Sequence, residues 1–298
     1  MTISRDDSPA GLAQAGLVPG APVDLATGAV RVRRLLGLNP GPMTGPGTNS
    51  YLLGTQSLTL IDPGPIDAAQ QQNFLDAIGD ATLTNIVVTH THGDHSPAAK
   101  GLAALTGARL IGLNAPDAAG QDHSFVSDRV CTDGDVIACQ DGASHYSLQL
   151  VHTPGHVSNH LCVLLREEGM LFTGDHVLQG TTPVILPPDG NMSDYLNSLT
   201  RLLELPLVSL APAHGEMMLA PFTEIEKLIA HRLKREAKIL GALRELGECS
   251  DDDLVQKAYD DVGSHLLVWA KKTMSAHLIK LEQDGLALFD APLWKAVR

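Results

Sequence analysis

The side chains best suited to catalysis lie close together in the sequence. The run His90-Thr91-His92-Gly93-Asp94-His95 places three histidines and an aspartate within six positions, directly after the apolar segment 85–89. Such a segment predicts a buried strand, so the run is expected to form the loop at its end. Imidazole nitrogens and carboxylate oxygens are the ligands of catalytic zinc ions. The density of these groups favours a metal site over a loop of unrelated polar residues.

Three later segments repeat the pattern of an apolar strand followed by a turn with a possible ligand. The turns present His156 after Thr-Pro-Gly, Asp175 after Thr-Gly, and His214 after Ala-Pro-Ala. Taken singly, each is compatible with an ordinary loop residue. The four motifs in this order are far more specific, and they indicate a metal centre assembled from several strand ends.

The order H-x-H-x-D-H, T-P-G-H, G-D and A-H-G resembles the metallo-β-lactamase superfamily of hydrolases over residues 30 to 220. The resemblance implies a four-layer αβ/βα sandwich of two mixed sheets, with the metals at one edge. It implies that the first metal is bound by His90, His92 and His156. It implies that the second is bound by Asp94, His95 and His214, and that Asp175 bridges both.

Asp62, in Leu60-Ile-Asp-Pro-Gly64, matches an early aspartate of this family. The match implies that it supports a metal-binding histidine without touching the metal. Its sequence context is equally compatible with a simple turn aspartate before Pro-Gly.

Further segments narrow the resemblance to one subgroup, the lactamase-β-like group. They are 39–53, 173–177, 187–190 and the C-terminal segment. Animal members of this group act as endoribonucleases, and bacterial members are commonly called β-lactamase-like or hydroxyacylglutathione-hydrolase-like. One departure is that Ala-Pro-Ala, rather than a Pro-Gly turn, precedes His214.

Hydrolysis by a metal-bridging hydroxide is the reaction that this ligand set predicts. Two metals about 3.5–4 Å apart lower the pKa of a bridging water towards about 7, which removes the need for a serine or cysteine nucleophile. We expect Asp94 and His214 to be the catalytic residues, with Asp94 also orienting the nucleophile. Two Zn²⁺ ions are the expected cofactors because histidine predominates, with Mn²⁺ or Fe²⁺ as alternatives.

The remaining histidines are expected to have other roles. His176 follows the bridging aspartate and is a candidate for the outer shell, His160 for packing or a supporting hydrogen bond, and His152 for a structural role. The others lack companion ligands and are expected at the surface or satisfied in the core: His123, His145, His231, His265 and His277.

Alternating short apolar runs and helical stretches indicate an α/β (α+β) fold. Strands are expected at 30–36, 50–53, 57–61, 85–89, 109–112, 147–151, 161–165 and 170–172. Helices are expected at 67–78, 96–105 (with Ser96 as its N-cap) and 193–203. Three helices, at 222–245, 250–260 and 265–284, followed by two short strands, outline a winged helix. We therefore expect an irregular leader at 1–28, a hydrolase domain at 29–221 and a small winged-helix-like domain at 222–298.

The charge distribution weighs against nucleic acid as the main substrate. The net charge is -13, and residues 1–221 hold 9 basic against 21 acidic side chains. The C-terminal segment holds 12 against 13, with its bases interspersed among acids. The first hypothesis is therefore a small-molecule ester, thioester or lactam-type substrate, and single-stranded RNA is the alternative. A non-enzymatic binding module is the third, and the complete ligand set argues against it.

Several other expectations concern the environment of the protein and of its pocket. The N-terminus lacks an apolar signal-peptide core, no apolar stretch is long enough to span a bilayer, and the four cysteines form no C-x-x-C pair. A cytoplasmic location without membrane association is expected, whereas the oligomeric state is unknown. The loop 39–50 and the segment 179–188 are expected to shape the pocket, and Tyr195 either lines it or packs in a helix core.

Overall fold

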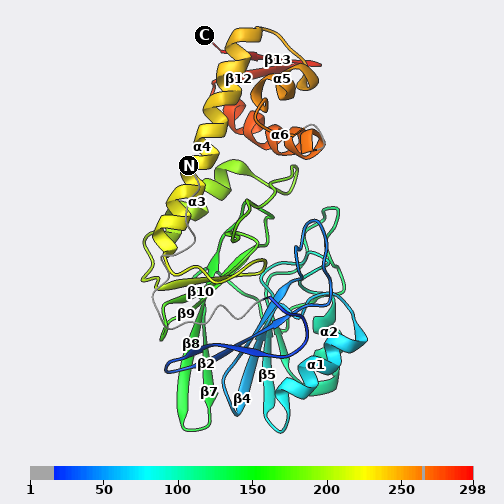
Figure 1. The fold of residues 1–298 in the computed structure, drawn as a ribbon, viewed down its shortest axis with the longest axis vertical. Coiled ribbons are helices and arrows are strands. Elements are labelled where there is room, and N and C mark those ends of the chain that lie inside the picture. The colour runs from blue at the N-terminus through cyan, green and yellow to red at the C-terminus, as the bar shows by residue number, and fades with distance from the viewer. Residues whose placement is uncertain (1–16, 264–265, 298) are drawn as a thin grey trace.

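The computed structural model describes residues 17–263 and 266–297, in which thirteen strands and six α-helices form the predicted layered architecture. The expected four-layer sandwich with an appended winged helix is confirmed. Figure 1 shows the two large sheets side by side at one end of the long axis and the C-terminal helices at the other.

The first sheet contains the first six strands in their sequence order. They are β1 (Val23–Thr27), β2 (Arg31–Leu36), β3 (Asn49–Leu53), β4 (Ser57–Ile61), β5 (Thr82–Val87) and β6 (Arg109–Ile111). Strands β1 to β4 pair antiparallel, whereas β4, β5 and β6 are parallel. The parallel crossovers contain α1 (Ala68–Ile78) and α2 (Ala98–Thr106).

The second sheet has the order β11-β10-β9-β8-β7. Its strands are β7 (Val136–Asp141), β8 (Ser144–His152), β9 (Leu161–Leu165), β10 (Met170–Gly174) and β11 (Ser209–Pro212). Only β10 and β11 are parallel, with α3 (Met192–Leu202) between them. Strands β4, β5, β8, β10 and β11 therefore point the same way within their sheets, so their carboxyl ends define one edge in each.

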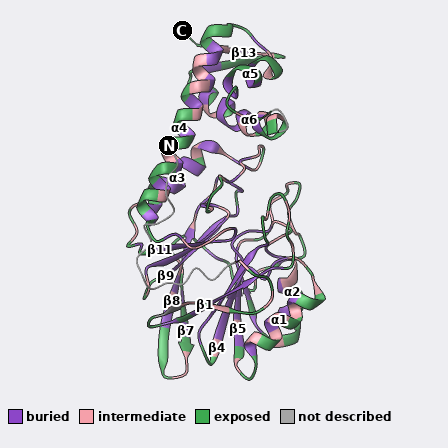
Figure 2. Cartoon of the chain, viewed as in Figure 1, coloured by how far each residue is buried: buried purple, intermediate pink, exposed green. Residues whose placement is uncertain are grey.

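Three apolar clusters hold these layers together. The central one joins the inner faces of the sheets, through residues such as Leu53, Leu150 and Phe172. The second packs the outer face of the first sheet against α1 and α2, and the third packs the other sheet against α3 and the start of α4. Figure 2 shows the resulting burial of the strands between their helical covers.

The C-terminal segment contains α4 (Pro221–Leu246), α5 (Asp251–Ala258), α6 (Leu267–Gln283), β12 (Ala287–Asp290) and β13 (Leu293–Ala296). Helix α5 begins at the predicted Ser250 cap, where Ser250 and Asp253 form a reciprocal capping box. Helix α4 belongs to two cores. Its first turns pack on α3, whereas Ile239 and Leu243 pack with α5 and α6.

Three local predictions are wrong. Val23–Thr27 was expected in an irregular leader but forms β1, because it pairs with β2; residues 1–16 lie outside the described part. Helix α2 begins at Ala98 rather than after a Ser96 cap, since the Ser96 hydroxyl donates to Asp122 Oδ2 at 2.7 Å. The spacing of the apolar residues in 222–245 predicts one buried helix face that includes Leu233, but Leu233 is 47% exposed because polar Arg232 and Glu236 occupy the buried face of α4.

Candidate metal centre

The sheet edges defined above converge at the predicted ligand cluster. Backbone hydrogen bonds join the two sheets there, from Leu161 N to Thr89 O and from Asn49 N to Ala213 O, each at 2.7 Å. Each candidate ligand lies just beyond a strand that ends at this edge. The turns of one sheet that contain candidate ligands are thus held close to those of the other sheet.

Three histidine nitrogens meet on one side of the cluster. His92 Nδ1 is 3.0 Å from His90 Nε2 and 3.1 Å from His156 Nε2. Ligand nitrogens about 2.0–2.1 Å from a tetrahedral ion are about 3.3 Å apart, so this spacing is close to that of a three-histidine site. His90 and His156 are buried, while His92 is partly exposed.

A second group of donor atoms lies beside the first. His214 Nε2 is 3.3 Å from Asp94 Oδ2 and 3.4 Å from Asp175 Oδ1. His95 Nε2 is 3.6 Å from the same oxygen of Asp94 and 3.5 Å from Asp175 Oδ1. These groups are close enough to hold a second ion.

Asp175 connects the two groups through its two carboxylate oxygens. Its Oδ1 faces His95 and His214, whereas its Oδ2 is 3.7 Å from His156 Nε2. Asp175 Oδ1 and His95 Nε2 are buried without a hydrogen-bond partner. Buried polar atoms normally have partners, so these two orphaned donor atoms fit a divalent ion between them.

The electrostatics differ between the two groups. Burial, together with neighbouring imidazoles, holds the pKa of His90 well below its ordinary value and lowers the pKa of His92 to about 4. Burial also acts to lower the pKa of His95, but the carboxylates of Asp94, Asp175 and Asp62 outweigh it and raise that pKa. His90 and His92 are therefore held in the neutral form in which imidazole binds metals, whereas His95 is paired with carboxylates.

Hydrogen bonds fix the far nitrogen of most of these histidines. His95 Nδ1 is 2.9 Å from Asp62 Oδ2, and Asp62 also accepts from the backbone N–H and the hydroxyl of Thr89. His156 Nδ1 donates to Val184 O at 2.6 Å, and His214 Nδ1 lies 3.3 Å from Gly47 O. Such bonds set the tautomer and ring orientation of a metal ligand.

The ring of His160 holds the backbone of Asp175. His160 Nε2 accepts from the Asp175 N–H at 3.1 Å, and His160 Nδ1 bonds the Thr153 hydroxyl at 2.8 Å. Gly174 has a φ of +48°, and an added Cβ would come within 2.6 Å of His160 Nε2. The turn before Asp175 therefore requires glycine.

The remaining histidines differ in their burial and in their partners. His176 is fully buried, with its ring 4.8 Å from that of Tyr195, and burial lowers its pKa to about 3. His152 Nε2 bonds Ser158 O, and His277 is buried against Glu236. His123, His145 and His231 are exposed, and His265 lies outside the described residues.

Sequence reasoning missed the contributions of Asn49 and Val184. Asn49 Nδ2 donates to Pro212 O at 2.9 Å and to Gly215 O at 2.8 Å, which holds the turn that carries His214. A hydrophilic residue at the start of an apolar strand was the only sequence signal for Asn49. Val184 acts through its backbone carbonyl and leaves no such signal. Tyr195, for which two roles were open, is fully buried in the core around α3.

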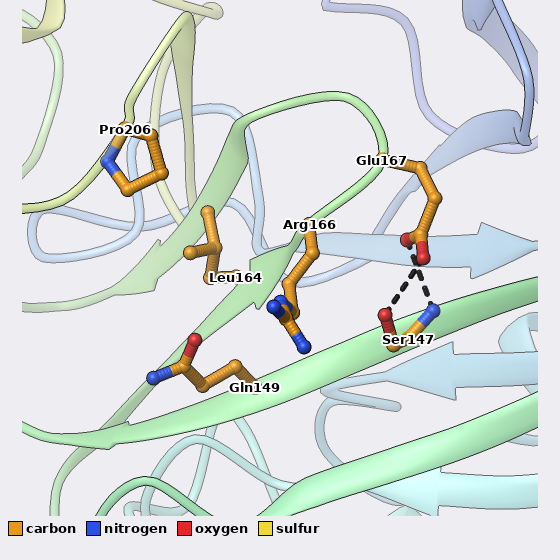
Figure 3. Close-up of a pocket in the computed structure, with 6 residues that line it drawn as sticks. All are labelled: Ser147, Gln149, Leu164, Arg166, Glu167 and Pro206. Carbon is orange, nitrogen blue, oxygen red and sulfur yellow. Dashed lines mark hydrogen bonds between the residues drawn. The ribbon is translucent and has the colours of Figure 1, made fainter.

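A surface pocket lies beside β8 and the end of β9, and none of the residues that line it is a candidate ligand (Figure 3). It is lined by Ser147, Gln149, Leu164, Arg166, Glu167 and Pro206. Glu167 accepts from both the N–H and the hydroxyl of Ser147. The pocket contains no histidine, and its carboxylate is already engaged.

Comparison with known proteins identifies the family of the chain. The family model described as the metallo-beta-lactamase superfamily matches residues 43–214, and the beta-lactamase associated winged helix domain matches residues 250–294. A beta-lactamase-like protein 2 homolog from Caenorhabditis elegans is 32% identical over 262 residues, which is 86% of this chain and 85% of that protein. An atrochrysone carboxyl ACP thioesterase from Aspergillus novofumigatus is 31% identical, over 87% of this chain and 81% of that protein.

Solved structures show the same fold at lower identity. A beta-lactamase domain protein from Burkholderia ambifaria aligns with a TM-score of 0.76 and 23% identity, over 95% of this chain and 96% of that one. A metallo-beta-lactamase family protein from Thermus thermophilus aligns with a TM-score of 0.72 and 22% identity, over 89% and 98%. The chain belongs to the metallo-beta-lactamase superfamily, whose members are metal-dependent hydrolases, and it has a C-terminal beta-lactamase-associated winged helix domain.

Proposed function

We propose that the protein is a dinuclear metal-dependent hydrolase that cleaves an ester, thioester or lactam-type bond in a small molecule. The observation that supports this most directly is the sharing of Asp175 between two groups of donor atoms. One carboxylate oxygen faces His95 and His214, and the other faces His156. A bridging carboxylate of this kind suits two ions held side by side.

The proposed ligands are those expected from the sequence. His90, His92 and His156 would hold the first ion, and Asp94, His95 and His214 the second, with Asp175 between them. Zn²⁺ is the proposed metal because five of these seven residues are histidines, and Mn²⁺ or Fe²⁺ would accept the same donors. Two bound divalent ions would supply a water of lowered pKa and a Lewis acid that polarises the substrate carbonyl.

The residues of the chain then have separate roles. Asp94 is the most exposed of the acidic donors, with 28% of its side chain accessible against 13% for Asp175. We assign it the orientation of the attacking water and the acceptance of its proton. His214, 3.3 Å from Asp94, would hold that carboxylate in place on the side open to solvent. Asp62 and His160 would keep His95 and Asp175 oriented during turnover.

Two observations support a small substrate. The relative from Aspergillus novofumigatus is named as a thioesterase, and this name supports the proposal of a thioester as one of the bonds cleaved. The bases of the C-terminal segment are largely engaged with acids of the same segment: Arg235 and Lys238 with Asp261, and Lys271 with Asp252. An anionic polymer would have to compete with these pairs.

We also propose a division of the chain and a location for it. The hydrolase domain would span 29–221, joined by strand β1 from the preceding segment, and the winged-helix-like domain would span 222–298. A cytoplasmic location is proposed because all four cysteines are free thiols, as is usual in a reducing compartment. No helix in the described ranges has the length and apolarity needed to cross a bilayer.

The proposal is tested by metal content and by a panel of substrates. Purified protein saturated with zinc is expected to retain two ions per chain. It should hydrolyse at least one of nitrocefin, a glutathione thioester and a homoserine lactone, and lose the activity with a chelator. His92→Ala should abolish turnover, whereas exposed His145→Ala should not. One ion per chain at saturation would contradict the dinuclear mechanism, and chelator-sensitive cleavage of single-stranded RNA alone would contradict the substrate class.

A further inference from the structure

A buried arginine on α4 reaches the loop that supports the metal centre. Arg232 is only 3% exposed, and its Nη2 donates to the backbone carbonyl of Pro183. Its guanidinium lies 5.4 Å from the centroid of the Tyr195 ring. No carboxylate forms an ion pair with Arg232 among the described residues. The mixture of bases and acids along 222–245 predicts a solvated helix face, but Arg232 is buried, and burying an arginine without a counter-charge is costly.

The first connection from Arg232 to the metal centre runs along the backbone. Pro183, which accepts its hydrogen bond, directly precedes Val184. The carbonyl of Val184 accepts from His156 Nδ1 at 2.6 Å. Arg232 therefore anchors the chain one peptide away from the carbonyl that orients His156. The neighbouring Ile185 is fully buried in the same apolar cluster as the start of α4.

The second connection runs through Tyr195. Its hydroxyl donates to the carbonyl of His176 at 2.9 Å, next to Asp175 in the chain. Its backbone packs so closely on Gly155 that a Cβ at this glycine would overlap the Cα of Tyr195. Gly155 precedes His156, so Tyr195 supports both turns on which these ligands lie. Arg232 packs over the ring of this tyrosine from α4.

We propose that Arg232 is a positioning residue for the first metal, acting through the Pro183–Val184 backbone and through Tyr195 on His156. The consequence is that the C-terminal segment is needed for metal affinity in a domain to which it contributes no ligand. This inference rests on the proposed function, because it assumes that His90, His92 and His156 hold an ion. Loss of such supporting contacts typically lowers metal affinity by about 10–100-fold.

The test measures metal affinity rather than turnover. Zn²⁺ binding is titrated against a chromophoric chelator in the full chain, in a His214→Ala background that weakens the proposed second site. Arg232→Met is expected to weaken zinc binding by about 10–100-fold, and Arg232→Lys by less, because lysine retains a donor and the charge. Co²⁺ substituted for Zn²⁺ should show an altered visible spectrum in Arg232→Met.

Arg235→Met is the matched control. Arg235 lies on the same helix and also packs on an aromatic ring, that of Tyr259, but its hydrogen bonds go to Ala258 O and Asp261. It should destabilise the winged helix and leave zinc affinity within about twofold of the parent, as expected for a residue outside the supporting network.

The outcomes distinguish the role of Arg232 from the proposed dinuclear hydrolase. Zinc affinity within twofold of the parent in a folded Arg232→Met protein would overturn the role of Arg232 and leave the dinuclear hydrolase intact. Failure of the wild-type chain to bind zinc would overturn both. Should Arg232→Met not fold, Arg232→Lys and Tyr195→Phe carry the test, since Phe retains the ring and loses the bond to His176. Unchanged affinity in both would overturn the proposal.

Discussion

Asp62 combines a backbone conformation that is unfavourable with a side chain that makes three hydrogen bonds. Its φ of 50° lies in the left-handed region, which costs a non-glycine residue about 1 kcal/mol or more. Its two oxygens accept from the N–H and the hydroxyl of Thr89 and from His95. Aspartate tolerates this region better than most residues, and the three hydrogen bonds offset the backbone cost that remains.

Replacement of Asp62 by asparagine should weaken the second metal position. The amide retains the shape of the side chain but brings a donor towards groups that themselves donate. We expect zinc affinity at the position formed by Asp94, His95 and His214 to fall by about 10–100-fold, with a smaller effect on the first position. Chelator competition measures both. Asp67→Asn is the control, since Asp67 caps α1 and asparagine caps equally well. Unchanged zinc affinity in Asp62→Asn would mean that Asp62 forms the turn but does not support the metal position.

The sequence was most informative at this scale where several ligand-type residues share one motif. Side chains of the run from His90 to His95 come together with His156, Asp175 and His214 in groups that could hold a metal ion. Residues that act through the backbone or from a distance could not be recognised. Val184 contributes a backbone carbonyl, which leaves no signal in the sequence. Arg232 is one of several bases on a predicted helix, and the sequence does not show that a neighbouring loop covers it.

At the scale of elements, the success of each strand prediction depends on how clearly the sequence marks the strand as an apolar run. Strands 57–61 and 161–165 were predicted at their observed bounds because they are short apolar runs between turn formers. Strand β7 was missed because its apolar run, Val-Ile-Ala-Cys, is short and only Ile137 and Cys139 of the strand are buried. Strand β1 was missed because its Gly- and Pro-rich surroundings resemble a loop, and pairing with β2 decides its structure.

Substitution of Gly174 tests how tightly the end of β10 is packed. An alanine Cβ there would come within 2.6 Å of His160 Nε2 and 2.7 Å of Thr89 Oγ1. We expect Gly174→Ala to destabilise the fold by about 2–4 kcal/mol and to reduce zinc retention, because Asp175 must shift. Gly180→Ala is the matched control, since Gly180 also has a positive φ but nothing lies within 4 Å of its added Cβ. Equal destabilisation of the two variants in thermal or urea unfolding would refute the packing argument.

The contact between α4 and α6 predicts a pH-dependent stability. Glu236 on α4 accepts from Lys280 at 2.9 Å, and His277 lies 3.3 Å from it. Burial lowers the pKa of His277 despite this carboxylate, so the folded protein keeps the imidazole neutral. The unfolded chain then binds more protons below about pH 6.5, and the stability that is complete above this pH decreases as the pH falls.

His277→Gln should flatten this dependence. For one proton the slope is at most about 1.4 kcal/mol per pH unit, so the wild type should lose more stability than the variant between pH 7.5 and 5.5. The measurement is urea unfolding in chelator, so that bound metal does not contribute. His145→Gln, at an exposed position, should retain the wild-type slope. Parallel curves for His277→Gln and wild type would show that His277 titrates normally.

At the scale of the whole molecule, α4 couples two parts that the sequence divides at residue 221. Its first half belongs to the core around α3 and its second half to the winged helix. The boundary expected at this residue rests on the sequence alone, and the sequence does not reveal that one helix is shared by both cores. The position of Arg232 in the first half gives this sharing a functional consequence under our proposal.

The charge of the molecule predicts weak binding of single-stranded RNA. The net charge is -13, and the bases on α4 and α6 are mostly paired within their own domain, such as Arg235 with Asp261 and Lys271 with Asp252. Even basic proteins bind nucleic acid non-specifically with a Kd of only about 10⁻⁴–10⁻⁶ M at physiological salt. We therefore expect a Kd weaker than about 10⁻⁴ M for a labelled oligoribonucleotide, measured by fluorescence anisotropy with zinc-loaded protein.

Salt dependence separates this expectation from the RNA alternative. Contacts to several phosphates would make affinity fall steeply between 50 and 200 mM salt, because bound counterions are released. Lys271→Glu would then weaken binding further, although Lys271 is remote from the metal ligands in the sequence. A micromolar Kd with both properties would favour RNA as substrate and make the winged helix its binding surface. Weak binding that does not depend on Lys271 would instead favour a small-molecule substrate and leave α4, through Arg232, with the proposed support of the first metal position.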